Sequence, residues 1–255
     1  MAVSPPELYN DWWVYLRSSG NSMGSTYLNP SDKQIHNAYK MRAALQAQSY
    51  GPKAIAGVIG CAQVESCLSP GAIQKWSVLP NNGENIADVP NSYMLQYYHP
   101  TAGGQGYGLG ILQWDRFSGT YQTNDLLGWT NANNYMWYDG DGQMARLAFE
   151  YSHNSQYNFW KLNYGSSLTW DVYKDIEHSQ FSNYDAGECA IVWTSCWEVS
   201  SLDPTGRQHR RENGQFWYQY FIDHPNPPTP TPEFPIWLLF QFNRKKELKN
   251  GRRKF

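Results

Sequence analysis

Cysteine is scarce in this sequence of 255 residues, which contains four. Cys61, Cys67, Cys189 and Cys196 form no Cys-x-x-Cys pair, so a zinc site is not expected. Cysteines without a metal or a disulfide are usually buried and behave as small apolar side chains. We favour buried free thiols; a disulfide within residues 61–67, or between this segment and residues 189–196, is the alternative.

Long apolar runs and nucleotide-binding motifs are missing too. The longest apolar stretch, residues 234–242, is far shorter than the roughly 20 residues of a membrane-spanning helix. Residues 1–20 lack the basic and apolar regions of a secretory signal. No phosphate loop occurs, and the glycine spacing at residues 106–110 differs from the dinucleotide fingerprint. We therefore expect no transmembrane helix, signal peptide, cofactor or metal.

Charge is sparse and unevenly distributed. Residues 244–254 hold seven Lys and Arg residues and one acid, a net charge of +6, whereas the rest of the chain carries a net charge of -8. A basic tail on an acidic body suggests that the tail has its own partner, such as a phosphate backbone, an anionic membrane or an acidic protein. A solvated, disordered end is the alternative.

Aromatic residues, by contrast, are abundant, with 12 Trp and 19 Tyr. One core has limited room for so many large rings, so we expect some at the surface, where Trp and Tyr suit the apolar faces and hydroxyls of sugars. An unusually aromatic core is the alternative explanation.

The apolar periodicity predicts a mainly α protein, with α+β as the alternative. Helices are expected over residues 31–48, 53–66, 141–153, 185–198 and 205–222. Ser31, Asp141 and Asp185 are the expected N-caps, and Pro52 suits a first helical turn. We divide the chain into an N-terminal arm (1–30), a helical domain (31–223), a Pro-rich linker (224–235) and an apolar, then basic tail (236–255).

Glu65 ends the expected buried helix, just before a Ser-Pro-Gly turn. The negative end of the helix dipole and apolar neighbours such as Val64 and Leu68 both disfavour a charged carboxylate, so both would raise the pKa of Glu65. A raised pKa suits a general acid. Taken alone, however, a glutamate at a helix end is more often structural.

A second stretch, GYGLGILQWDR, supplies groups that suit sugar binding. The candidate binding residues here are Tyr107, Gly108, Gly110, Gln113, Trp114 and Arg116, and Asp115 adds a second carboxylate. The glycines would let backbone approach a ligand closely. Gln113 offers a donor and an acceptor, and Trp114 offers a stacking face.

Together these stretches resemble the phage tail lysozyme family, of the lysozyme and lytic transglycosylase superfamily. Glu65-Ser66, Leu68, Pro70 and Ala72 match its first motif, and Gly108, Gly110, Gln113, Trp114 and Arg116 match its second. Residues 190–221 resemble its closing element, through Trp197-Glu198 and Arg207 or Arg210. We expect one of these arginines to pair with a structural Glu198.

The resemblance implies a lysozyme-like helical domain whose long loops line a cleft. It also implies cleavage of the β-1,4 bond between N-acetylmuramic acid and N-acetylglucosamine in peptidoglycan, with Glu65 as general acid and Ser66 among the binding residues. Asp115 stands where a small hydroxyl residue is expected. It is our candidate base for an inverting hydrolase, in which the two carboxyl groups lie about 6.5–9.5 Å apart. In a lytic transglycosylase no second carboxylate is needed.

The resemblance further implies a virion-associated enzyme, in a phage tail or inside the particle, that opens the wall for DNA entry. A non-catalytic wall-binding or structural tail protein is one alternative, and an endolysin for host lysis is another. For residues 224–255 we favour docking to virion protein over contact with an anionic membrane or DNA.

Overall fold

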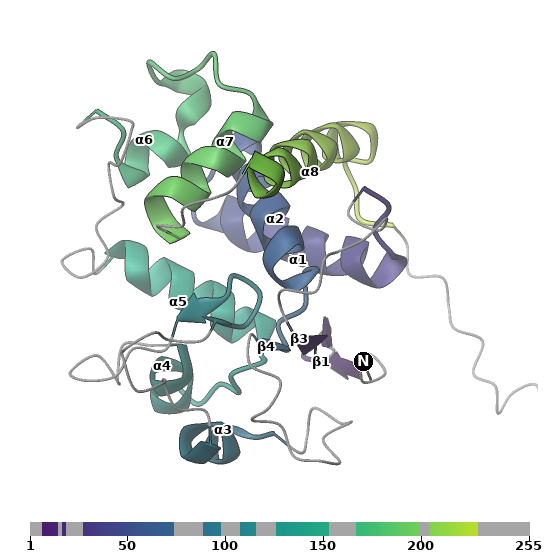
Figure 1. Ribbon diagram of the computed structural model, residues 1–255, viewed down its shortest axis with the longest axis vertical. Helices are drawn as coiled ribbons and strands as arrows, with labels where there is room; N and C mark the ends of the chain where they lie inside the picture. Colours follow the sequence, from purple (N-terminus) through teal and green to yellow (C-terminus); the bar gives the residue numbers. More distant parts are fainter. Residues whose placement is uncertain are drawn as a thin grey trace, which may run out of the picture. The chain divides into compact units, whose positions relative to one another are not determined.

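A computed structural model describes residues 7–14, 17–18, 28–73, 89–97, 108–115, 126–152, 167–198 and 204–228 (Figure 1). The chain forms two units, residues 1–225 and residues 226–255. Most of residues 74–107, the residue Arg116 and the tail from residue 229 onward lie outside the described part, so the predictions for Tyr107, Arg116 and the tail fall there.

The described residues are mainly helical, as predicted. The helices are α1 (Asp32–Ala47), α2 (Pro52–Ser66), α3 (Asn91–Tyr97), α4 (Leu126–Ala132), α5 (Gly140–Ser152), α6 (Trp170–Lys174), the 3₁₀ turn η4 (Ile176–His178), α7 (Ala186–Trp193), the π-helical turn η5 (Thr194–Glu198) and α8 (Pro204–Asp223). The strands are β1 (Glu7–Tyr9), β2 (Trp12–Val14), β3 (Arg17–Ser18), β4 (Ala72–Ile73), β5 (Gly108–Leu109) and β6 (Trp114–Asp115).

The helix starts follow local sequence rules, with one correction. Ser31 and Gln34 form a reciprocal capping box on α1, and Pro52 opens α2. The Asp185 side chain caps α7 by accepting from the backbone N–H of Glu188. For α5 the predicted N-cap was wrong by two residues: Asp139, not Asp141, accepts from the first backbone N–H groups.

Helix α2 is buried among α1, α7 and α8 (Figure 1). Glycine makes the closest of these contacts. A Cβ on Gly60 would lie 2.6 Å from the backbone nitrogen of Gly214 in α8, and a Cβ on Gly57 would lie 2.8 Å from the backbone nitrogen of Ala190 in α7. At these points α2 therefore packs directly against the backbone of α7 and α8.

A small sheet includes β4, the first strand after α2 in the chain. It has the strand order β3-β4-β5-β6, in which β3 and β4 are parallel and the other pairs are antiparallel. Ile73 in β4 pairs with Leu109 in β5, and Gly108 in β5 pairs with Asp115 in β6. The sheet thus brings the GLGILQWD hairpin beside the end of α2.

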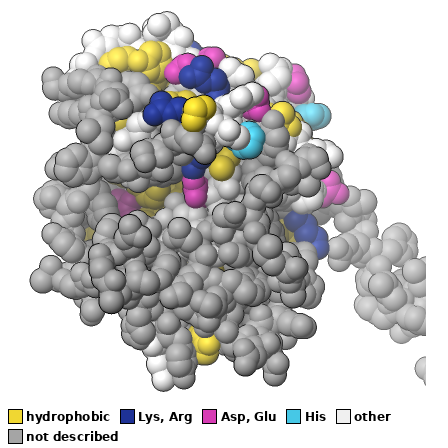
Figure 2. All heavy atoms as spheres, in the orientation of Figure 1, with side chains coloured by type: hydrophobic (Ala, Val, Ile, Leu, Met, Phe, Trp, Pro, Cys, Tyr) yellow, Lys and Arg dark blue, Asp and Glu magenta, His cyan; other side chains and the backbone are white. Residues whose placement is uncertain are grey.

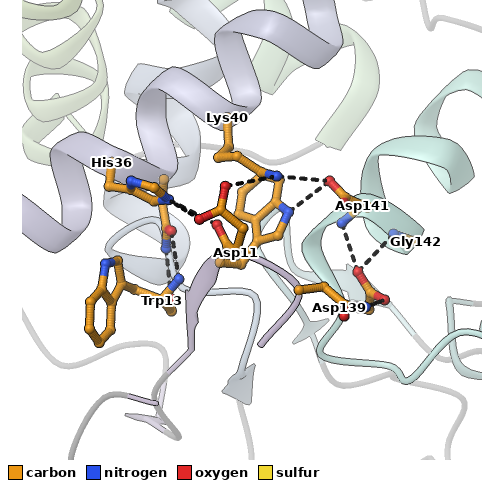
Figure 3. Close-up of polar contacts among 10 residues, drawn as sticks. Asp11, Trp13, His36, Lys40, Asp139, Asp141 and Gly142 are labelled. Atoms are coloured by element: carbon orange, nitrogen blue, oxygen red, sulfur yellow. Dashed lines mark hydrogen bonds and ion pairs between the residues drawn. The ribbon is translucent and has the colours of Figure 1, made fainter. Parts of the chain in front are cut away.

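The hairpin of β1 and β2 packs against α1 and α5 (Figure 3). At its turn, Asp11 contacts His36 and Lys40 of α1. The fully buried Trp12 donates its indole N–H to Asp141 of α5 over 2.8 Å. Residues 7–14 are therefore joined to the helical domain by both apolar burial and polar contacts.

The core contains many of the aromatic rings and all four cysteines. Trp12, Trp137, Trp193 and Trp217 are among its largest fully buried side chains. The four cysteines are free and buried, which confirms the prediction that we favoured. Across the helices that the structure describes, none is long and apolar enough to cross a membrane.

Replacing Gly60 with alanine tests the close helix contact. The added Cβ meets the backbone of Gly214, which cannot rotate away, so α2 and α8 must separate. We expect Gly60→Ala to lower the free energy of unfolding by about 1–3 kcal/mol, as for other overpacked cores. Urea unfolding would measure this, with the exposed substitution Gln46→Ala on α1 as the control. Equal unfolding midpoints for the two variants would contradict the packing argument.

Candidate functional site

Glu65 lies in the last turn of α2, and its side chain is 25% exposed. Its Oε1 accepts a hydrogen bond from Nη2 of Arg210 in α8, whose side chain is only 6% exposed. Both residues lie within about two helical turns of the contact between Gly60 and Gly214. The carboxyl group is thus partly open to solvent on one side and held by a buried guanidinium on the other.

Arg210 contacts an acid that the sequence did not pair with it, because its guanidinium contacts Glu65. The sequence suggested that Arg207 or Arg210 pairs with Glu198. The side chain of Glu198 lies outside the described atoms, so that pairing stays a prediction. Burial lowers the pKa of Arg210, although an arginine remains charged at neutral pH. The crossing of α2 and α8 brings Glu65 and Arg210 together. No short sequence motif predicts this contact.

Ser66 links Glu65 to the β5–β6 hairpin. Its buried hydroxyl lies 2.7 Å from the carbonyl oxygens of both Ala62 and Ile111. A hydroxyl has one proton, so it donates to one of these oxygens at a time. The contact with Ile111 fixes the hairpin turn next to the end of α2, which gives Ser66 a role inside the fold.

Position 110 requires glycine for two reasons, its backbone conformation and a neighbouring side-chain amide. Its φ of 83° lies in the left-handed region, and a Cβ would lie 2.8 Å from the side-chain amide of Gln143. That amide, on α5, accepts from Ile111 N–H over 2.7 Å and donates to the carbonyls of Pro70 and Trp137 over 2.9 and 2.6 Å. Gln143 therefore joins three segments around the site, and the sequence analysis missed it.

The side chain of Gln113 points back to the β5–β6 turn in which it lies. Its amide donates to the carbonyl of Gly110 over 2.7 Å, and more weakly to that of Ala72 over 3.4 Å. A Cβ on Gly108 would lie 2.6 Å from the Gln113 Oε1 atom. Both glycines of this motif thus make room for glutamine side chains of the protein itself, where the sequence suggested a ligand.

Trp114 and Asp115 form strand β6. The indole of Trp114 is 6% exposed and donates its N–H to Glu150 Oε1 over 2.7 Å, so in this conformation it offers little surface to a sugar. Asp115 pairs through its backbone with Gly108, and its side chain lies outside the described atoms. Its separation from Glu65 therefore stays a prediction.

Glu150 on α5 is a buried acid that the sequence analysis missed. Its Oε1 lies 3.2 Å from Arg146 Nε, and its Oε2 accepts from the indole N–H of Trp197 over 3.1 Å. Burial raises the pKa of Glu150 to about 7, while Arg146 and the two indole bonds act in the opposite direction. Its signal in the sequence is an Arg-Glu pair four residues apart, a pattern that usually marks an exposed helix face.

Positive and negative side chains are mixed on the face of the molecule that Figure 2 shows. There, Lys, Arg, Asp and Glu side chains are interspersed over the part that α7 and α8 form. Within the described ranges, no group of three His, Cys, Asp or Glu side chains is arranged to hold a metal ion.

Comparison with known families agrees with these motifs. The family model for phage tail lysozymes matches residues 36–221, which include Glu65, the β5–β6 hairpin and Arg210. The chain belongs to the phage tail lysozyme family. This confirms the resemblance seen in the sequence and supports a muralytic phage protein, a glycosidase that acts on peptidoglycan. A comparison with curated proteins gave no match.

The raised pKa of Glu150 predicts a pH-dependent stability for this family member. Between the ordinary value of 4.5 and about 7, the folded protein keeps a proton that the unfolded chain has released. This contribution to the free energy of unfolding is therefore full below pH 4.5 and is lost as the pH rises towards 7. Glu150→Gln lacks it, so the melting temperature of the wild type should fall relative to this variant over that range. Thermal denaturation at several pH values would measure the difference, with Glu188→Gln as control; a constant difference would contradict it.

Proposed function

We propose that this protein cleaves the β-1,4 bond between N-acetylmuramic acid and N-acetylglucosamine, with Glu65 as the general acid, and that it opens the cell wall locally for phage DNA entry. The observation that carries the proposal is the partly exposed Glu65 carboxyl group held by Arg210 beside the β5–β6 hairpin. The family match over residues 36–221 supports the substrate class.

Arg210 is placed to stabilise the negative charge that develops on a general acid when it gives up its proton. It contacts Oε1 of Glu65, and we assign the transferred proton to Oε2. Once that proton has moved to the glycosidic oxygen, Glu65 is negative and the guanidinium stabilises it. Before the reaction the same contact favours the ionised form, whereas the helix C-terminus favours the neutral form. The balance of these opposing effects would set the pH range of activity.

For the second step we propose two routes that differ in their product. In the first, Asp115 on β6 activates a water molecule and leaves a reducing end, as in an inverting hydrolase. In the second, the muramyl 6-hydroxyl attacks internally and an anhydro end forms. Mass spectrometry of the released muropeptides distinguishes the two ends directly.

Glu65→Gln tests the general acid. Glutamine keeps the size of the side chain but has no proton to give, so release of soluble muropeptides from peptidoglycan should fall by at least about 100-fold. The matched control is Glu188→Gln, because Glu188 pairs with Arg211, the residue next to Arg210 on α8. Equal release by Glu65→Gln and wild type would refute the role of Glu65. Binding to walls without release by the wild type would favour a wall-binding tail protein instead.

We also propose that the tail docks to virion protein. The exit from α8 is fixed to α1, because Tyr39 donates to the carbonyl of His224 and Arg42 donates to that of Pro225 over 3.0 Å. A deletion that spares these contacts should begin at residue 229. We expect removal of residues 229–255 to leave muropeptide release intact and to abolish incorporation into phage particles, as measured by immunoblotting of purified particles. Particles that still contain the shortened protein would contradict docking through the tail.

A further inference from the structure

One buried carboxylate joins two tryptophans from distant parts of the chain. Glu150 Oε1 accepts from Trp114 Nε1 over 2.7 Å, and Glu150 Oε2 accepts from Trp197 Nε1 over 3.1 Å. Trp114 belongs to β6 and Trp197 to the π-helical turn η5. Each oxygen of a single side chain thus holds a different structural element.

The two indoles also contact each other. Their rings meet edge to face with centroids 5.7 Å apart, and Trp197 stacks on the fully buried Trp193 at 5.0 Å. The π-helical turn widens the end of α7, and such turns often occur at functional sites. Here it carries the indole that reaches Glu150.

The contacts continue from β6 to the proposed general acid. Strand β6 pairs with β5, and the turn between them is bound by Ser66, the residue after Glu65. Glu150 therefore holds one side of the hairpin while the end of α2 holds the other.

We propose that Glu150 is a positioning residue, which acts through Trp114 and Trp197 to hold the β5–β6 hairpin and its Asp115 at the end of α2. This role rests on the proposed muralytic function, because its consequence is the rate of that reaction. Glu150 itself lies fully buried and so presents no surface to a substrate.

The ionised form holds both indoles best. A carboxylate accepts strongly at both oxygens, whereas protonation turns one oxygen into a hydroxyl, which is a weaker acceptor and must itself donate, so the indole N–H bonded to that oxygen is held less firmly. Among the described residues, the titratable and charged groups around Glu150 are Arg146 on its own helix and Tyr50 from the turn after α1, with Tyr151 and Lys174 beside Tyr50. Since burial raises the pKa of Glu150 to about 7, the two forms exchange near neutral pH.

Indole N–H resonances report on this directly in the full-length chain. With ¹⁵N-labelled tryptophan, Trp114→Phe and Trp197→Phe assign the two signals. We expect both signals to shift between pH 5 and pH 9 with one shared midpoint near neutral, and to lose this shift in Glu150→Gln. A purely structural contact with a permanently charged acid would leave both signals constant. Signals that titrate with unrelated midpoints in the wild type would overturn the proposal even if Glu150→Gln does not fold, because one carboxylate would then not hold both indoles.

Activity tests the consequence for the site. Displacing catalytic groups by about 1 Å can cost 100-fold in rate, so we expect folded Glu150→Gln to release muropeptides at least about tenfold more slowly, with binding to walls unchanged. Glu177→Gln is the matched control, because Glu177 accepts from the backbone of Lys53 at the other end of α2. Wild-type release by folded Glu150→Gln would overturn the positioning role. No release by the wild type would overturn the proposed function instead, while the indole titration would still report the Glu150 contacts.

Discussion

The close approach of α2, α7 and α8 is the constraint on which the rest of the structure depends. Gly57 and Gly60 bring the backbone of α2 against Ala190 and Gly214. With larger side chains at these positions the helices would stand further apart, and the buried guanidinium of Arg210 would not reach Glu65 at the open end of α2. The candidate site is thus a product of backbone packing, because the two charged groups come from helices whose backbones approach closely at Gly60 and Gly214.

Two acid-arginine pairs lie on either side of the β5–β6 hairpin. Burying their charges costs free energy of folding. Burying charges requires excellent geometry and further hydrogen bonds, and an apolar pair of similar volume is often as stable. Glu150 lies fully buried beside Arg146, and Glu65 lies beside the nearly buried Arg210. The gain is in position, since each acid is fixed in one orientation relative to the hairpin.

Local rules predicted much of the fold and little of the site. The capping box at Ser31, the start of α2 at Pro52 and its end near Glu65 depend on neighbouring residues, and all were predictable. The contacts of Trp114 and Arg210 join residues 36 and 145 positions away, which no short pattern specifies. Glu150 was overlooked for the same reason, because an Arg-Glu pair four residues apart does not reveal which helix face is buried.

Residues of the β5–β6 hairpin motif stabilise the fold and also shape the candidate site. Gly108 and Gly110 leave space for the amides of Gln113 and Gln143, and Trp114 binds a buried acid. These residues therefore shape the site even where no sugar touches them. If Glu65 is the general acid, as we propose, one change at Glu65 would remove activity and leave the packing of this motif intact. The packing of the hairpin motif is thus separate from the chemistry that we propose for the carboxyl group at the end of α2.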